Sequence, residues 1–258
     1  IGDCAFRGIA IEDTQFLMKM PQLRIIGYQK LEYYGVEKNS ENKVASLPTG
    51  GSSDILVDSG HQATDKNKKV YGSEVFTNCN QLKEVTLPAS VEQIGSRAFY
   101  FKATAVDDVY SSSSKITKVT WTSSTDKSAA VTRTIYSEAF GGNVSIKTIV
   151  LPENQGAGES LIIEPYAFFA NVALENVGVT GDGSNVLPVT LKAVKRRVFS
   201  DCNSLKKITI KPTEEGFCPA LDEGVFMWCT SMQEATLPND VVEIPKKFFY
   251  NVPLTTFN

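Results

Sequence analysis

The chain has 258 residues, of which 42% are hydrophobic and 21% are charged. This composition is typical of a globular protein and argues against disorder, a collagen-like fibre or a coiled coil. Lys and Arg number 26 against 29 Asp and Glu, so the net charge of -3 gives no overall cationic character for binding nucleic acid. No apolar run reaches the roughly 18 residues of a membrane helix, so we expect no membrane insertion within this segment.

The first 26 residues carry one incomplete copy of a short repeat. The repeat consists of an aliphatic residue, four intervening positions and then Phe, and Ile1 with Phe6 fits this spacing. Ile11 and Phe16 have the same spacing and compete for the same place. Because Ile1 lies inside a repeat and solenoid ends need a polar cover, we expect 1–26 to be a partial N-terminal repeat of an excised segment.

Residues 27–70 interrupt the pattern. Tyr28, Tyr33 and Tyr34 precede a polar stretch that is rich in Gly, Ser and Lys. We expect an irregular insertion here, with a hairpin through 55–57. A loop of this length in a compact array is either functional or mobile, and the sequence leaves both open.

From residue 71 onward the aliphatic-to-Phe unit recurs at short intervals. Its rings belong to Phe76, Phe99, Phe140, Phe168, Phe199, Phe226 and Phe249. The segment before each Phe is too short for a stable helix. We therefore predict one helical or 3-10 turn that places each ring in the core.

A second unit follows most of these Phe residues by six positions. Its last three positions alternate inward, outward and inward, which is typical of a strand with one buried face. The copies begin at Leu82, Ile116, Ile146, Leu174, Leu205 and Met232. Pro88, Pro152 and Pro238 directly follow three of these strands, and proline lacks the N–H that would extend a ladder.

A repeat of this size, 23 residues from Phe76 to Phe99, cannot bury its apolar side alone. Stacked copies whose strands form one parallel sheet solve the problem. The fold class that we predict is α/β: a right-handed solenoid with a parallel β-sheet on one face, short helical or 3-10 turns opposite, and irregular loop insertions. Residues 71–258 supply about six to seven units of one continuous domain. A β-sandwich with coincidental matches is the alternative.

Residues 82–99 read Leu-Lys-Glu-Val-Thr-Leu-Pro-Ala-Ser-Val-Glu-Gln-Ile-Gly-Ser-Arg-Ala-Phe. This segment resembles the BspA-like leucine-rich-repeat (LRR) surface protein family, whose pattern is roughly L-x-x-I-x-L-P-x-x-V-x-x-I-G-x-x-A-F-x-x-C. The resemblance covers 71–258 and, in part, 1–26. It implies a bacterial surface or secreted protein that adheres to host matrix proteins or to other cells.

Insertions lengthen several connections between a strand and the next aliphatic residue. They follow Trp121, Leu151, Val179 and Ile210, and they are rich in loop-forming residues. Insertions at the same phase of a solenoid lie on the same flank, so we expect these loops side by side. A different insertion, 102–115, falls between Phe99 and the strand that follows it.

Three of the five cysteines lie three residues after a repeat Phe. At Cys79, Cys202 and Cys229 we expect a small side chain that packs inward, which is also the cysteine position of the resembling family. A disulfide between Cys202 and Cys229 stays open, and Cys4 and Cys218 have no assigned place. No pair has C-x2-C spacing, so we predict no metal site.

No group of residues suits catalysis or a cofactor. His61 is the one histidine, and a Ser or Cys nucleophile normally needs a base beside it. Asp107-Asp108 and Glu214-Glu215 are sequence neighbours, which does not establish the separation across a cleft that a glycosidase needs. We predict a protein that is not an enzyme and that has no cofactor.

The outward strand positions align from repeat to repeat and form a predicted contact strip. It comprises Glu84, Thr86, Lys118, Thr120, Thr148, Asn176, Lys207, Thr209, Glu234 and Thr236. Sheet propensity alone is an alternative reason for the threonines. Trp228 and Tyr250, near the Phe turns, offer a separate platform for stacking on sugars.

These features predict a non-enzymatic interaction module that is extracellular or on the cell surface. The resemblance implies adhesion, and the expected partner is a host matrix or cell-surface protein, or a glycan. One alternative is a structural spacer that presents another domain, and a second is a glycan-binding or glycan-processing accessory protein. The sequence leaves the oligomeric state open.

Overall fold

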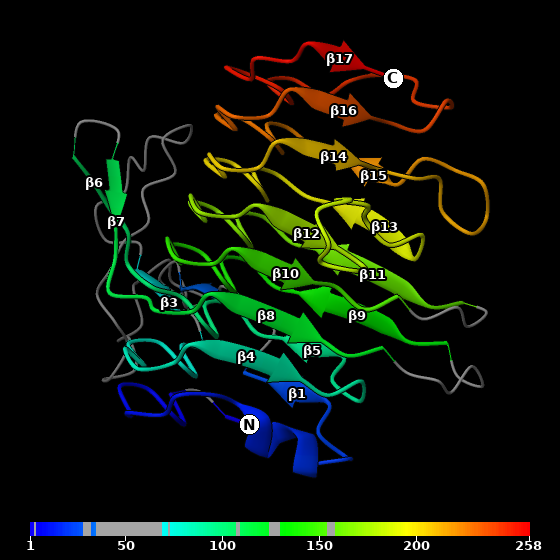
Figure 1. Cartoon of the computed structure of the whole chain (residues 1–258). Helices are drawn as coiled ribbons and strands as arrows, with labels where there is room; N and C mark the ends of the chain where they lie inside the picture. Colours follow the sequence, from blue (N-terminus) through cyan, green and yellow to red (C-terminus); the bar gives the residue numbers. More distant parts are fainter. Residues whose placement is uncertain are drawn as a thin grey trace, which may run out of the picture.

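The computed structural model describes residues 1–2, 4–27, 32–34, 69–71, 73–106, 109–123, 130–153 and 158–258. These residues form a solenoid whose coils stack in chain order from the N-terminal to the C-terminal end (Figure 1). Its strands form parallel sheets, so the predicted fold class is confirmed. His61 and the predicted hairpin through 55–57 lie outside the described residues.

The strands predicted from the apolar spacing form the first sheet, which has two parts. In most of these strands the inward residues, such as Val85 and Val119, are buried while the residues beside them are exposed or half-buried. The four-stranded part contains β4 (Glu84–Leu87), β8 (Lys118–Trp121), β10 (Thr148–Val150) and β12 (Asn176–Gly178). The three-stranded part contains β14 (Lys207–Thr209), β16 (Glu234–Thr236) and β17 (Thr256–Phe257).

A short segment, 185–187, accounts for the division of this sheet. Asn185 comes from the insertion after β12 and is buried between β12 and β14. Its Oδ1 accepts a hydrogen bond from the Val177 N–H (3.0 Å), and its Nδ2 donates to the carbonyls of Glu175 (3.0 Å) and Lys207 (3.1 Å). The backbone of the segment bonds to both sides as well, because the Thr209 N–H donates to the Asn185 carbonyl (2.9 Å) and the Val186 carbonyl accepts from the Val179 N–H (3.2 Å). The segment therefore takes the place of direct pairing between β12 and β14.

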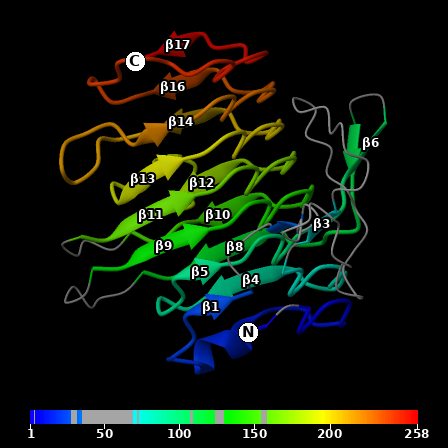
Figure 2. The same cartoon turned by 180° about the vertical axis from the view of Figure 1, so that it is seen from behind.

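The aliphatic residues that open five of the Phe units lie in a second parallel sheet, which the sequence analysis missed. Its six strands are β1 (Ile25–Ile26), β5 (Gln93–Ile94), β9 (Thr132–Ile135), β11 (Ser160–Ile163), β13 (Leu191–Val194) and β15 (Ala220–Leu221). Ile94, Ile135, Ile163 and Val194 point inward from it and are buried. Each coil thus has a strand on two sides, and Figure 2 shows this second sheet in front.

The Phe segments are turns, and η1 (Gln15–Lys19) is the one helix in the described residues. The residue two positions before each Phe has a positive φ, between 45° and 66°, in all eight coils. This left-handed backbone cannot continue a right-handed helix, which is why the predicted helical turns are replaced by hydrogen-bonded turns. The Phe N–H then donates to the next coil, as from Phe199 to the Val225 carbonyl (2.9 Å).

The eight repeat rings form a continuous row through the core. Neighbouring rings are parallel within 14°, with centroids 4.6–5.8 Å apart. The row runs through Phe6, Phe76, Phe99, Phe140, Phe168, Phe199, Phe226 and Phe249. Phe6 therefore takes the first place, and Phe16 packs at its side with the two rings tilted by 59°. The predicted inward packing of the rings is confirmed.

The position three residues after the repeat Phe satisfies backbone carbonyls inside the core. Cys79 donates its thiol hydrogen to the Phe6 carbonyl (2.9 Å), and Cys229 donates to Phe199 (3.1 Å). Asn143 and Asn171 occupy the same position in other coils and donate to Phe carbonyls through Nδ2 at 2.7–3.2 Å. All five cysteines are free, so the structure contains no Cys202–Cys229 disulfide.

Two antiparallel pairs stand outside the coils. β2 (Glu32–Tyr34) pairs with β3 (Lys69–Tyr71), and β6 (Thr104–Val106) pairs with β7 (Val109–Ser111). The β6–β7 hairpin lies on the opposite side of the solenoid from the loop that follows β14 (Figures 1 and 2). The Tyr110 ring packs edge-on against Phe169 (6.1 Å), and its hydroxyl donates to Asp201 (3.2 Å). These contacts hold the hairpin against later coils.

Candidate contact surfaces

The structure brings the ten residues of the contact strip together on the outer surface of the first sheet. All ten are exposed or half-buried. In the four-stranded part Glu84, Lys118, Thr148 and Asn176 lie side by side in register. In the three-stranded part Lys207 lies beside Glu234, and Thr209 beside Thr236. The buried Asn185 separates the two parts, so the contact strip is interrupted between Asn176 and Lys207.

The N-terminal end of the contact strip is partly covered. The Gln15 side chain, at the start of η1, donates to the Thr86 hydroxyl (3.1 Å). The Thr14 hydroxyl donates to the Thr86 carbonyl (3.0 Å) and accepts from its N–H (2.7 Å). Thr86 is therefore engaged within the chain, and the accessible part of the contact strip begins beside it.

A second exposed column, which the sequence analysis missed, runs beside the contact strip. It consists of the residues just before the strands: Lys83, Thr117, Lys147, Glu175, Lys206 and Gln233. The two columns together form what we call the strand face. Opposite charges are neighbours across β4 and β8 and across β14 and β16. The strand face therefore carries positive and negative side chains side by side and not a patch of one charge.

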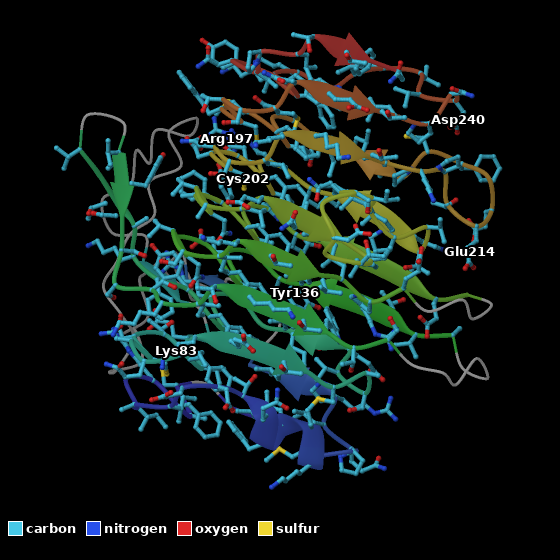
Figure 3. All side chains as sticks on the ribbon, viewed as in Figure 1. Lys83, Tyr136, Arg197, Cys202, Glu214 and Asp240 are labelled. Atoms are coloured by element: carbon cyan, nitrogen blue, oxygen red, sulfur yellow. The ribbon has the colours of Figure 1, made fainter. Side chains whose placement is uncertain are left out.

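The insertions after the first-sheet strands share one flank, as predicted. The Glu153 N–H donates to the Ser123 hydroxyl (3.1 Å), and the Glu153 carboxylate accepts from the Val189 N–H (3.4 Å). The Glu214 N–H in turn donates to the Val189 carbonyl (3.2 Å). Four insertions are thus joined in series, and Glu214 and Asp240 lie on this flank, opposite Arg197 and Cys202 (Figure 3).

A small groove lies on this insertion flank. Its lining is Gly158, Glu159, Val189, Thr190, Lys192, Thr213, Glu214 and Glu215. Glu159 forms a buried ion pair with Arg133 (2.9 Å), and Lys192 forms an exposed one with Glu215 (3.4 Å). These ion pairs give the charged residues of the groove a structural role within the solenoid.

A row of buried charges, Glu74, Arg97 and Glu138, crosses three successive coils at the left-handed position of the Phe turns. Arg97 lies between Glu74 (4.0 Å) and Glu138 (2.7 Å), and the exposed Arg7 contacts Glu74 from the first coil (2.8 Å). Burial raises the pKa of Glu138 even though Arg97 opposes this shift. Arg97 also lies over the Tyr100 ring, 4.7 Å from its centroid. This row links successive coils, and breaking a buried ion pair of this kind costs about 3–5 kcal/mol.

The buried thiols are unsuited to reaction because the thiolate is the reactive form. Desolvation raises the pKa of Cys202 and Cys229 far above the ordinary range, and it raises the pKa of Cys79 as well. In the described part of the chain no group of three or more His, Cys, Asp or Glu is arranged to hold a metal ion. Among the same residues, no helix has the length and apolar character needed to cross a bilayer.

Comparison with known protein families identifies these repeats. The family model described as "BspA type Leucine rich repeat region" matches in six copies over residues 63–156 and 133–258. The match covers both parts of the first sheet and all the repeat Phe residues except Phe6. A comparison with curated proteins finds no match to the chain.

Among the solved structures that are similar to the chain, that of TpLRR supports the same fold. The leucine-rich-repeat protein TpLRR of T. pallidum is 22% identical, with a TM-score of 0.51 and 68% of each chain covered. A leucine-rich-repeat protein from Bacteroides ovatus is 18% identical, with a TM-score of 0.31 over 72% of this chain and 62% of that one. A "leucine rich cell surface protein" from Faecalibacterium prausnitzii is 14% identical, with a TM-score of 0.23 over 67% and 65%.

Proposed function

The chain belongs to the BspA-type leucine-rich-repeat family, and on this premise we propose that it is an adhesion module that binds host matrix or cell-surface proteins through its strand face. Membership of the family implies a protein-interaction module, which is the coarser part of this function. The location that the proposal requires is extracellular or on the cell surface. The part of the strand face that binds is the contact strip with the exposed column beside it.

The register of the strand face is the observation that supports the proposal most strongly. Within each of its two parts, parallel pairing places equivalent residues of successive coils side by side, so the charges are held at fixed spacing. Because neighbouring strands lie about 4.8 Å apart, six coils span roughly 25–30 Å. A length of that order suits an interface of about 800 Å² per partner, in which many weak polar contacts add up.

Charge reversal on the strand face tests the proposal. We would measure binding of the chain to immobilised fibronectin, fibrinogen, laminin and collagen, with the wild type and the triple variant Glu84→Lys, Lys118→Glu, Lys207→Glu. The expected result is saturable binding of the wild type to at least one of these proteins, with a slower association rate and weaker affinity in the triple variant.

A matched control separates the strand face from charge in general. Lys211 and Lys246 are exposed and lie outside the strand face, so Lys211→Glu with Lys246→Glu changes two charges at other sites. This variant is expected to bind like the wild type. Binding that both sets of variants leave unchanged would show that another face makes the contact. Absence of binding to all four proteins would instead favour a structural spacer.

A further inference from the structure

Two exposed aromatic rings lie together on the turn side of the solenoid, away from the strand face. Trp228 and Tyr250 belong to the turns of Phe226 and Phe249, with ring centroids 5.6 Å apart and planes at 73°. Their exposed fractions are 40% and 51%, so neither ring serves mainly as core. The other tryptophan, Trp121, is only 2% exposed.

The backbone at Trp228 is poorly suited to a large side chain. Trp228 lies two residues after its repeat Phe, a position with positive φ in seven of the eight coils. The other six coils have Gly8, Asn78, Gly142, Ala170, Asp201 and Asn251 there, which are small residues or residues that tolerate this conformation. Trp228, with φ 65°, is the one bulky residue among these seven, since Phe101 in the remaining coil does not have a positive φ. Its presence therefore costs conformational free energy that core packing does not repay.

Polar groups surround the two rings. The backbone N–H of Trp228 donates to the backbone carbonyl of Tyr250 (2.9 Å), and this bond fixes the two turns against each other. The Lys247 ammonium lies 6.0 Å from the centroid of the Tyr250 ring. Asn251, in the same column as Trp228 on the next coil, is exposed. The result is an open aromatic corner with a cation and an amide at its edge.

We propose that this corner, made by Trp228 and Tyr250, binds carbohydrate. One face of a sugar ring presents C–H groups, and these stack on an exposed aromatic face. The hydroxyls at the rim of the sugar need donors and acceptors, which Lys247 and Asn251 supply. A protein hot spot, by contrast, lies at the centre of a broad patch that excludes water, whereas this corner is open and has Lys247 and Asn251 at its edge. The proposal does not depend on the strand face.

Calorimetric titration with soluble oligosaccharides tests this site. The probes are cellopentaose, chitopentaose, mannopentaose and laminaripentaose at concentrations up to the millimolar range. Trp228→Asn is the central variant because Asn fills the same left-handed position in two other coils, so the turn is preserved. Its melting temperature should equal or exceed that of the wild type. Phe217→Asn is the matched control, since Phe217 is 65% exposed on the insertion flank.

The expected result is saturable binding of the wild type and Phe217→Asn to at least one probe, with affinity reduced about tenfold or more in Trp228→Asn and in Tyr250→Ala. The tryptophan emission of the wild type should change on sugar binding. The change can be assigned to Trp228, because the other tryptophan, Trp121, is buried. Equal affinity in wild type and Trp228→Asn would overturn the proposal, as would binding to none of the four probes. Loss of matrix-protein capture in Trp228→Asn without sugar binding would also overturn it and assign the corner to a protein contact.

Discussion

Removal of one ring from the middle of the aromatic row should destabilise the whole array. Phe199 is fully buried, and its ring lies between those of Phe168 (5.5 Å, 6°) and Phe226 (5.6 Å, 4°). Phe199→Ala removes the apolar contacts and leaves a cavity, which costs about 3–5 kcal/mol for a buried Phe. Each stacked pair adds about 0.5–1.5 kcal/mol beyond burial, and both pairs are lost, so we expect the upper half of the range.

Urea denaturation followed by circular dichroism measures this loss as a change in the free energy of unfolding. Lys206→Ala is the surface control, because Lys206 is exposed on an adjacent part of the same coil, and it should change stability by less than about 0.5 kcal/mol. Phe6→Ala is a second comparison, since Phe6 is half-buried at the end of the row and should cost less than Phe199→Ala. Equal free energies of unfolding for Phe199→Ala and Lys206→Ala would refute the inward row.

Two further predictions concern side chains that join coils. Asn185→Ala leaves the Val177 N–H and two strand carbonyls without their partner, so it should cost about 2–3 kcal/mol in urea denaturation. Ser184→Ala, at a half-buried residue of the same loop, removes one hydroxyl contact with Thr180 and should cost about 1 kcal/mol or less. Similar values for the two variants would show that the amide does not hold the sheet together. Burial raises the pKa of Cys229 above its ordinary value of 9.0, so the unfolded thiol ionises first as pH rises. Between pH 9 and pH 10 the free energy of unfolding should therefore fall by about 1 kcal/mol more in the wild type than in Cys229→Ser. The same pH dependence of stability in both proteins would contradict the burial of an un-ionised thiol at this position.

The parts of the fold that repeat in residue type could be predicted from the sequence. Seven Phe residues of the row were identified by spacing, because only an apolar ring fits the same inward position in each coil, whereas spacing left the first place open between Phe6 and Phe16. The second sheet was missed because its strands are as short as two residues, as in β5 and β15, and alternation cannot be recognised over two positions. The helical turns were predicted wrongly because local spacing does not reveal the positive φ before each Phe.

Positions that repeat in role but not in residue type were harder to recognise. Cys202 and Asn171 occupy the same position and both donate to a Phe carbonyl, yet a pattern search treats thiol and amide as unrelated. Asn185 acts across two strands from within a loop, and nothing in its local sequence indicates that role. The order of the contact strip was predictable because outward positions alternate with buried ones, whereas the column from Lys83 to Gln233 lies outside that alternation.

Lysine footprinting tests the central claim, that the strand face is the binding surface, most directly. The free chain, and the chain bound to whichever matrix protein it recognises, would each be treated with an acetylating reagent. The extent of acetylation at each lysine would be quantified by mass spectrometry. Lys118, Lys147 and Lys207 should be protected in the complex, while Lys211 and Lys246, exposed elsewhere, should react as in the free chain. Protection of Lys211 and Lys246 with unchanged reactivity of Lys118 and Lys207 would contradict the account.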